Sequence, residues 1–242
     1  GVFLDAQGQP RYAIRVHQRA LAGQMRLLGA NHEDTFACRI NLATAYQSMG
    51  GRGDAIELYE QILADMVGVL DEDSSHALTA RSNLAAAYDL AGEELDRVIE
   101  LHGQVLAGRM RLLGANDPDT LVSRMNLAAA RQASGHPDRA IELFEQVLAD
   151  SVRLLGEPHP ATITCRSNLA GAHESAGDLD RAIELYEQVL AARMPLLGKY
   201  HPESLATRDN LIAAYQVTGR TEGRSIDEIL EDYRSLDIGF WC

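Results

Sequence analysis

The chain has 242 residues, a formal net charge of −13 at pH 7 and 46% hydrophobic residues. This acidic balance argues against non-specific binding to nucleic acid or anionic membranes, because both carry negative charge. No apolar run approaches the roughly 18 residues of a membrane span, and no basic leader precedes an apolar segment. The three cysteines, Cys38, Cys165 and Cys242, form no CxxC pair, which is typical of a reducing compartment. We expect a cytoplasmic protein without nucleic-acid or membrane partners.

The start of the chain matches the middle of a repeating unit. Farther along, the chain repeats a pair of helices joined at a glycine, as described below. Residues 13–21 resemble the second helix of such a pair, and Gly8 stands at the position of the joining glycine. Only residues 1–7 remain for the first helix. We therefore expect either a fragment of a longer protein or a degenerate first unit, and we favour the fragment because a stable array needs an N-terminal cap.

A five-residue motif that reads Arg-x-Asn-Leu-Ala, with Ile in the last copy, then recurs along the chain. Its asparagines are spaced by 42, 43, 42 and 42 residues, at Asn41, Asn83, Asn126, Asn168 and Asn210. A fixed period of this length indicates stacked structural repeats. The one longer step is explained by an extra residue near Glu93 and Glu94, in a turn where insertions are tolerated.

Each period contains two amphipathic helices. In the unit that begins near Pro160, apolar residues recur at helical spacing up to Gly177, and a second such run follows from Asp178 to Leu197. Glycine at Gly177 can adopt the left-handed conformation that ends a helix. The sequence predicts an all-α solenoid of antiparallel helix hairpins with about five and a half units, namely 1–29 (partial), 30–71, 72–114, 115–156, 157–198 and 199–219 (partial).

The last residues, 220–242, differ from the repeats. Residues 225–235 predict a capping helix with Ser225 as N-cap and acidic residues in its first turn. The apolar tail carries Phe240, the single tryptophan Trp241, and Cys242. Three interpretations remain open: the tail covers the last repeat, it docks in a groove of its own or a neighbouring molecule, or Cys242 is the substrate of a modifying enzyme.

The repeated pattern resembles a known family. Asn-Leu-Ala-x-x-Tyr, then glycine, then Ala-Ile-x-Leu-Tyr and finally Leu-Gly-x-x-His-Pro (197–202) is similar to tetratricopeptide repeats, specifically the 42-residue kinesin light chain subclass. The resemblance covers about residues 8–219 and implies a right-handed superhelix. Two departures are clear. Arginine replaces the usual tryptophan of the first helix, and the first-helix tyrosine of Tyr46, Tyr88 and Tyr215 becomes Arg131 and His173 in the middle units.

The resemblance implies that the first helices line a concave groove and that the repeated asparagines face it. An amide offers both a donor and an acceptor for the backbone of an extended peptide. We expect specificity to come from residues one turn away, among them Thr44, Ser48, Gln132 and Glu174. The structural alternative is that each asparagine caps or braces the neighbouring helix.

The repeated arginines allow two interpretations. They could pair at the repeat junctions with recurring glutamates (Glu57, Glu100, Glu142 and Glu184), or they could form a basic strip for an acidic partner, since arginine binds carboxylates bidentately. The arginines in question are Arg39, Arg81, Arg124, Arg166 and Arg208.

No catalytic, cofactor-binding or metal-binding motif is present in the sequence. The eight histidines form no HExxH pattern, no cysteine–histidine cluster has zinc spacing, and no phosphate-binding glycine loop occurs. We therefore expect no enzyme, no metal and no cofactor. The sequence predicts a scaffold that binds a protein or peptide, of acidic character if the arginines are free. The alternative is a structural or self-associating module of a larger signalling protein.

Overall fold

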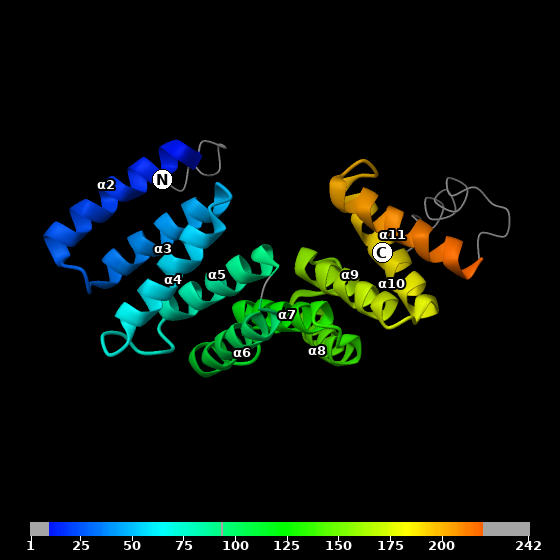
Figure 1. Ribbon diagram of the computed structural model, residues 1–242. Coiled ribbons are helices and arrows are strands. Elements are labelled where there is room, and N and C mark those ends of the chain that lie inside the picture. Colours follow the sequence, from blue (N-terminus) through cyan, green and yellow to red (C-terminus); the bar gives the residue numbers. More distant parts are fainter. Residues whose placement is uncertain (1–9, 93, 220–242) are drawn as a thin grey trace. The chain divides into compact units, whose positions relative to one another are not determined.

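The computed structural model describes residues 10–92 and 94–219, which form ten α-helices and no strand (Figure 1). The first helices of the predicted hairpins are α3 (Glu33–Ser48), α5 (Ser75–Ala91), α7 (Pro118–Ala133), α9 (Pro160–Ser175) and α11 (Pro202–Thr218). The second helices are α2 (Pro10–Leu28), α4 (Arg52–Met66), α6 (Leu95–Leu112), α8 (Pro137–Leu155) and α10 (Leu179–Leu197). The predicted all-α architecture of consecutive helix hairpins is confirmed.

The chain divides into two compact units, which we call unit 1 (residues 1–130) and unit 2 (residues 131–242). In unit 1 α2 packs on α3, α3 on α4, α4 on α5 and α5 on α6, and α3 also contacts α5. In unit 2 α8 packs on α9, α9 on α10 and α10 on α11. Contacts between sequence neighbours are what stacked repeats require. The predictions for Gly8, the capping helix and the tail with Trp241 lie outside the described residues.

The turns inside the hairpins depend on glycine. Gly50, Gly92, Gly135 and Gly177 all have a positive φ, between 71° and 83°. This is the left-handed conformation that the sequence predicts, and it is accessible to glycine without steric cost. At the one longer step, Glu94 has φ 55° and precedes α6 as its N-cap residue. The extra residue is thus accommodated by the one described residue other than glycine with a positive φ.

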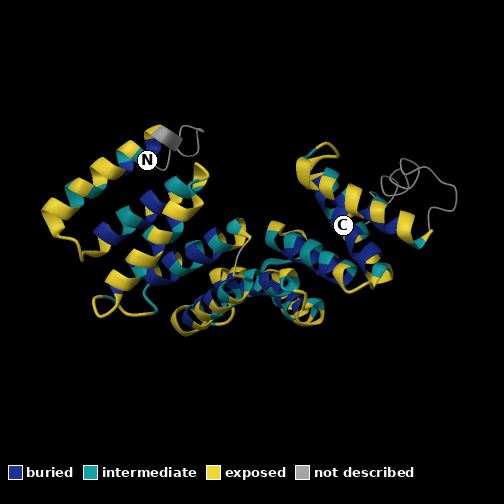
Figure 2. Cartoon of the chain, viewed as in Figure 1, coloured by how far each residue is buried: buried dark blue, intermediate teal, exposed yellow. Residues whose placement is uncertain are grey.

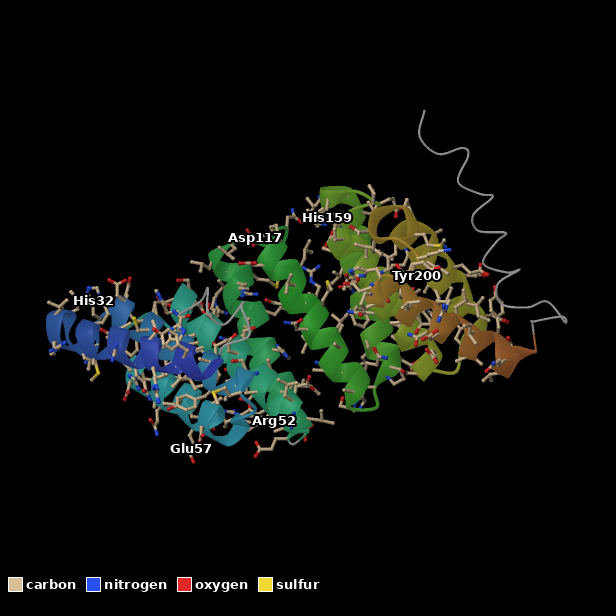
Figure 3. The ribbon with its side chains drawn as sticks, turned by 90° about the horizontal axis from the view of Figure 1, so that it is seen from above. His32, Arg52, Glu57, Asp117, His159 and Tyr200 are labelled. Atoms are coloured by element: carbon tan, nitrogen blue, oxygen red, sulfur yellow. The ribbon has the colours of Figure 1, made fainter. Side chains whose placement is uncertain are left out.

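The loops between hairpins supply helix N-caps at one repeated position. The imidazole Nδ1 atoms of His32, His159 and His201 accept hydrogen bonds from the backbone N–H two residues later, at 3.2, 3.2 and 3.3 Å. Asp117 accepts the equivalent bond with its carboxylate at 2.9 Å, and Ser74 caps α5 through its hydroxyl. His32, Asp117 and His159 accordingly lie where first helices begin (Figure 3). These caps satisfy backbone donors that the helix leaves unpaired.

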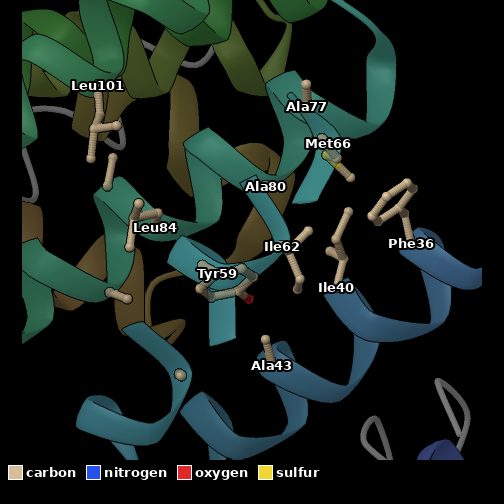
Figure 4. Packing of buried hydrophobic residues seen from close by; sticks show 13 residues of the cluster. Phe36, Ile40, Ala43, Tyr59, Ile62, Met66, Ala77, Ala80, Leu84 and Leu101 are labelled. Carbon is tan, nitrogen blue, oxygen red and sulfur yellow. The ribbon is translucent and has the colours of Figure 1, made fainter. Parts of the chain in front are cut away.

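The core runs between the helices of each unit. In unit 1, Phe36 from α3, Tyr59 from α4 and Leu84 from α5 are at most 1% exposed and belong to one packed cluster (Figure 4). Each helix has a buried side toward its neighbours and an exposed side opposite (Figure 2). Burial of each such large side chain stabilises the fold by about 1.5–3 kcal/mol.

One close approach in unit 1 requires a residue without a side chain. A Cβ atom added to Gly108 of α6 would lie 2.5 Å from Leu78 Cδ2 and 2.7 Å from Asp73 Oδ1. Asp73 is itself held by two hydrogen bonds from Arg111, at 2.5 and 2.8 Å. The buried Leu78 side chain and the Asp73 carboxylate held by Arg111 therefore occupy the space that a larger residue at position 108 would need.

Candidate peptide-binding face

The repeated asparagines all lie on first helices and none of them is buried. Asn41 and Asn210 are exposed, while Asn83, Asn126 and Asn168 are half-buried. Residues three and seven positions after each asparagine share its side of the helix, because a helix has 3.6 residues per turn, and the residue six positions after it lies about 120° away, at the edge of that side. We call these positions on one helix, together with its asparagine, the Asn face. On α3 it comprises Asn41, Thr44, Gln47 and Ser48, and on α9 it comprises Asn168, Gly171, Glu174 and Ser175.

In unit 1 the asparagine of one hairpin contacts the hairpin before it. The buried Tyr59 of α4 has its hydroxyl 2.8 Å from Thr44 Oγ1. Asn83 of α5 donates from Nδ2 to the same Thr44 oxygen over 3.5 Å. Burial raises the pKa of Tyr59, and the hydrogen bonds with Thr44 and Asn83 partly oppose that rise. Asn83 thus braces a junction between hairpins.

Unit 2 repeats this junction with different chemistry. Tyr186 of α10 is 1% exposed and donates its hydroxyl proton to Glu174 Oε2 over 2.8 Å. Asn210 of α11 donates from Nδ2 to the Tyr186 oxygen over 3.4 Å. Burial first, and then the Glu174 carboxylate, raise the pKa of Tyr186 above its ordinary value. Asn210 therefore braces as Asn83 does, but the tyrosine it contacts holds a carboxylate.

The other three asparagines differ from these two. Asn41, Asn126 and Asn168 make no hydrogen bond with any residue that the structure describes. For Asn168 the reason is visible in the sequence, because Phe144 stands where Tyr59 and Tyr186 stand in their repeats and offers no hydroxyl. The bracing interpretation applies to Asn83 and Asn210, whereas the amides of the other three have no partner among the described residues.

Gly171 lies one turn before Glu174 on α9. A Cβ atom added to Gly171 would lie 3.5 Å from the Tyr186 hydroxyl and 3.7 Å from Gln132 Nε2. Gln132 is fixed by a hydrogen bond from Nε2 to Ser175 Oγ of 2.9 Å. Of the predicted specificity residues, Gln132 lies near Gly171, and Glu174 is joined to the same place through the Tyr186 hydroxyl. Thr44 contacts Tyr59, and Ser48 donates to the Ala45 carbonyl at 2.9 Å.

The predicted pairing of the repeated arginines with the recurring glutamates is wrong for the pairs that the structure describes. Glu100 pairs with Arg97 at 2.7 Å and Glu184 with Arg181 at 2.6 Å, each three residues away on the same helix. Glu57 is exposed on α4 (Figure 3). A partner within the same helix turn is nearer than any arginine of another helix.

Most of the repeated arginines have other partners. Arg39 pairs with Asp65 at 2.6 Å, Arg81 donates to the Glu72 carbonyl at 2.5 Å, and Arg208 pairs with the adjacent Asp209 at 2.8 Å. Arg166 is 8% exposed and forms an ion pair with Glu157. An acidic ligand would have to replace these partners, so the geometry gives little support to a basic strip.

Two further junction contacts were not expected from the sequence. The first joins first-helix tyrosines to glutamates of the preceding hairpin. Tyr88 donates to Glu60 over 2.7 Å, and Tyr215 donates to Glu187. The hydrogen bond to Glu60, followed by burial, raises the pKa of Tyr88 to about 12. In the sequence, the repeated pair Glu60-Gln61 and Glu187-Gln188 on second helices could have indicated this contact.

The second contact involves two arginines at one repeated position of the second helices. Arg109 donates to Ser123 Oγ at 2.8 Å, and Arg193 donates to Thr207 Oγ1 at 2.5 Å. Both also donate to a backbone carbonyl of the next first helix. In each case the hydroxyl residue occurs opposite the arginine, so these two positions vary together along the chain.

Among the described residues, no three side chains of histidine, cysteine, aspartate or glutamate gather as a metal site would require. Three of the histidines are N-caps, as described above, and His17, His102 and His173 are buried. None of the described helices has the length and apolar character of a bilayer span.

Comparison with known proteins identifies the family. The tetratricopeptide repeat model matches residues 1–66, 76–151 and 150–194. No curated protein sequence matches the chain. One similar crystal structure is that of the kinesin light chain "nearly identical TPR-like repeats" from Podosopora anserina. Its sequence is 32% identical to this chain, and the TM-score is 0.71, with 80% of this chain and 92% of that chain covered. BtubC (BKLC) from P. vanneervenii is 23% identical, with a TM-score of 0.75 over 96% of this chain and 94% of that chain, and so shares the fold. The chain belongs to the tetratricopeptide repeat family and is similar to its kinesin light chain-like members.

Proposed function

We propose that this protein is an interaction scaffold that binds an extended peptide segment of a partner protein along the Asn faces of its first helices. Tetratricopeptide repeats generally mediate protein–protein interaction, and the family is established for this chain. The observation that carries the proposal is the set of amides left without a partner among the described residues, on Asn41, Asn126 and Asn168.

These amides have the chemistry that an extended backbone needs. Each peptide unit of a ligand presents one N–H donor and one carbonyl acceptor, and an asparagine side chain can meet both. Their positions recur with the repeat, so each amide can meet the backbone of an extended peptide in the same way on its own unit. In this proposal Asn83 and Asn210 keep neighbouring hairpins in register, and the other three contact the ligand.

The partner need not be acidic. No lysine or arginine occupies an asparagine position or the positions three, six and seven residues after it. The arginines of the repeated motif stand two residues before each asparagine, about 200° away around the helix. An acidic partner therefore stays a prediction that depends on displacing the contacts of those arginines.

Peptide selection tests the proposal. A random 12-residue peptide library displayed on phage is panned against the chain and against Asn41→Ala/Asn126→Ala/Asn168→Ala. We expect peptides enriched on the wild type to bind the triple variant at least tenfold more weakly, which corresponds to about 1.4 kcal/mol.

A matched control uses the bracing residues. Asn83→Ala/Asn210→Ala should lower thermal stability while it keeps most of the peptide affinity, because these amides face neighbouring hairpins. Circular dichroism verifies that each variant is folded. Equal peptide affinity of the wild type and the folded triple variant would remove the Asn faces from the binding mechanism.

A further inference from the structure

We infer that the Asn face of α9, in unit 2, binds a lysine or arginine side chain of the peptide, with its cation beside the carboxylate of Glu174. This inference rests on the proposed function and names the chemistry of the ligand at that site. It replaces the expectation of an acidic partner, for this unit, with the opposite charge.

Glu174 is a half-buried carboxylate that no cation of the described residues neutralises. Its Oε2 atom accepts the hydroxyl of Tyr186 at 2.8 Å, and no other hydrogen bond or ion pair of this side chain is found among the described residues. The other acidic side chains nearby are engaged, since Asp178 pairs with His173 at 3.0 Å and Glu187 accepts the Tyr215 hydroxyl. A partly desolvated carboxylate with a free oxygen is stabilised by an incoming cation.

The carboxylate is held in place before any ligand arrives. Tyr186 is 1% exposed, and its hydroxyl lies between Asn210 Nδ2 at 3.4 Å and Glu174 Oε2 at 2.8 Å. A buried ring cannot turn away without loss of packing. Less conformational entropy is therefore lost on binding than for a freely rotating surface glutamate, which favours affinity.

The groups near the carboxylate are polar. Gly171 lies one turn before Glu174 on the same side of α9 and contributes no side chain. The position of its absent Cβ is 3.5 Å from the Tyr186 hydroxyl and 3.7 Å from Gln132 Nε2, so the neighbouring groups are polar. Asn168 lies one turn further and offers an amide to the ligand backbone. An ammonium group has three donors and a guanidinium five, and the acceptor for them at this place is the Glu174 carboxylate, because Gln132 Nε2 donates and the Tyr186 hydroxyl is already engaged.

The matching position on α3 in unit 1 shows what the inference excludes. There the tyrosine hydroxyl of Tyr59 meets Thr44, a neutral hydroxyl, and Gln47 stands at the position of Glu174, whereas on α5 that position holds Asp89, which is exposed rather than half-buried. The α3 face therefore has no charge with which to select a cation. The chain as a whole carries −13, so a basic peptide is attracted at long range and the local carboxylate decides where its cation binds.

The experiment compares the peptides selected from the same random 12-residue phage library by three proteins. These are the wild type, Glu174→Gln, and Glu184→Gln, in which an exposed carboxylate of α10 paired with Arg181 is neutralised. Glutamine at 174 keeps an acceptor for the Tyr186 hydroxyl and removes only the charge. We expect lysine or arginine to be enriched at one position of the peptides selected by the wild type and by Glu184→Gln, and not by Glu174→Gln.

The affinity of one selected peptide sharpens the result. Replacement of its basic residue by glutamine should weaken binding to the wild type at least tenfold and leave binding to Glu174→Gln nearly unchanged, and the wild-type affinity should fall as salt is raised. The same basic enrichment on all three proteins, or enriched peptides without a basic residue, would overturn the inference and leave the proposed function standing. Failure of the wild type to enrich any peptide would overturn both.

Discussion

Tyr59 in unit 1 and Tyr186 in unit 2 occupy the same repeat position, are both buried, and reach different partners. The Tyr59 hydroxyl lies 2.8 Å from Thr44, whereas the Tyr186 hydroxyl donates to Glu174 over the same distance. In both units an asparagine of the next hairpin completes the contact. The scaffold is thus kept, and two first-helix differences, Gly171 in place of Thr44 and Glu174 in place of Gln47, replace a neutral contact with a charged one.

The comparison separates residues that maintain the array from residues that give each repeat its surface. The tyrosine ring fills the core of its hairpin in both units, which the hydrophobic contribution to folding requires. Its hydroxyl reaches the edge of the Asn face, where the first helix decides what it meets. Repeat proteins can therefore vary their ligand contacts repeat by repeat without disturbing the stack.

Removal of each hydroxyl is the most direct way to break this comparison. Tyr186→Phe should lower the free energy of unfolding by about 2 kcal/mol, because Glu174 loses a hydrogen bond to a charged group. Tyr59→Phe should cost about 1 kcal/mol, because only neutral groups lose a partner. Urea unfolding followed by circular dichroism measures both. A Tyr59→Phe variant that is as destabilised as Tyr186→Phe would show that the carboxylate adds nothing to the junction.

A smaller effect concerns a third copy of this position, His102 in unit 1. Its imidazole is 7% exposed, and burial lowers its pKa below the ordinary value of 6.5, although nearby Asp89 acts in the opposite direction. In the unfolded chain the group binds a proton near pH 6.5, while in the folded chain it stays neutral to lower pH. His102 therefore does not lower the free energy of unfolding above pH 6.5, and it lowers it increasingly as the pH falls below 6.5.

The substitution that tests this is taken from unit 2, where Phe144 stands at the same position. When the pH is lowered from 7.5 to 5.5, the free energy of unfolding of His102→Phe should fall by about 1 kcal/mol less than that of the wild type. Thermal unfolding at the two pH values measures the difference, with His32→Asp as the control because Asp117 caps its helix in that way. An identical pH dependence of wild type and His102→Phe would show that His102 is not the group responsible.

The repeat architecture could be predicted from the sequence because it depends on local signals. The 42-residue spacing of the asparagines predicts the hairpins, and the glycines at positions such as Gly50 and Gly177 predict the turns, whose positive φ values the structure confirms. The role of the loop histidines as N-caps was not predicted. His-Pro was interpreted only as a family pattern, although the sequence places Ser74 and Asp117 at the same repeat position and thus carried the signal.

The candidate site was predictable only in part. The repeat period identifies every asparagine, but whether one braces or remains available depends on a hydroxyl from another helix, as Asn168 beside Phe144 shows. The pairing of arginines with recurring glutamates failed because Arg97 and Arg181 stand three residues before Glu100 and Glu184 on the same helix. The glutamates pair with arginines of their own helix turn, and the repeat period alone does not show whether a glutamate pairs within its helix or with another helix.

The central claim, that a peptide binds along the Asn faces, is tested most directly by nuclear magnetic resonance on the deuterated, ¹⁵N-labelled chain. A peptide selected from the library is titrated in, and the side-chain amide signals of the five repeated asparagines are followed. Our account predicts that the signals of one or more of Asn41, Asn126 and Asn168 move with peptide concentration, and that Asn83→Ala leaves the titration curve unchanged. Shifts confined to second helices, with the side-chain amides of all five asparagines unmoved at saturation, would contradict it.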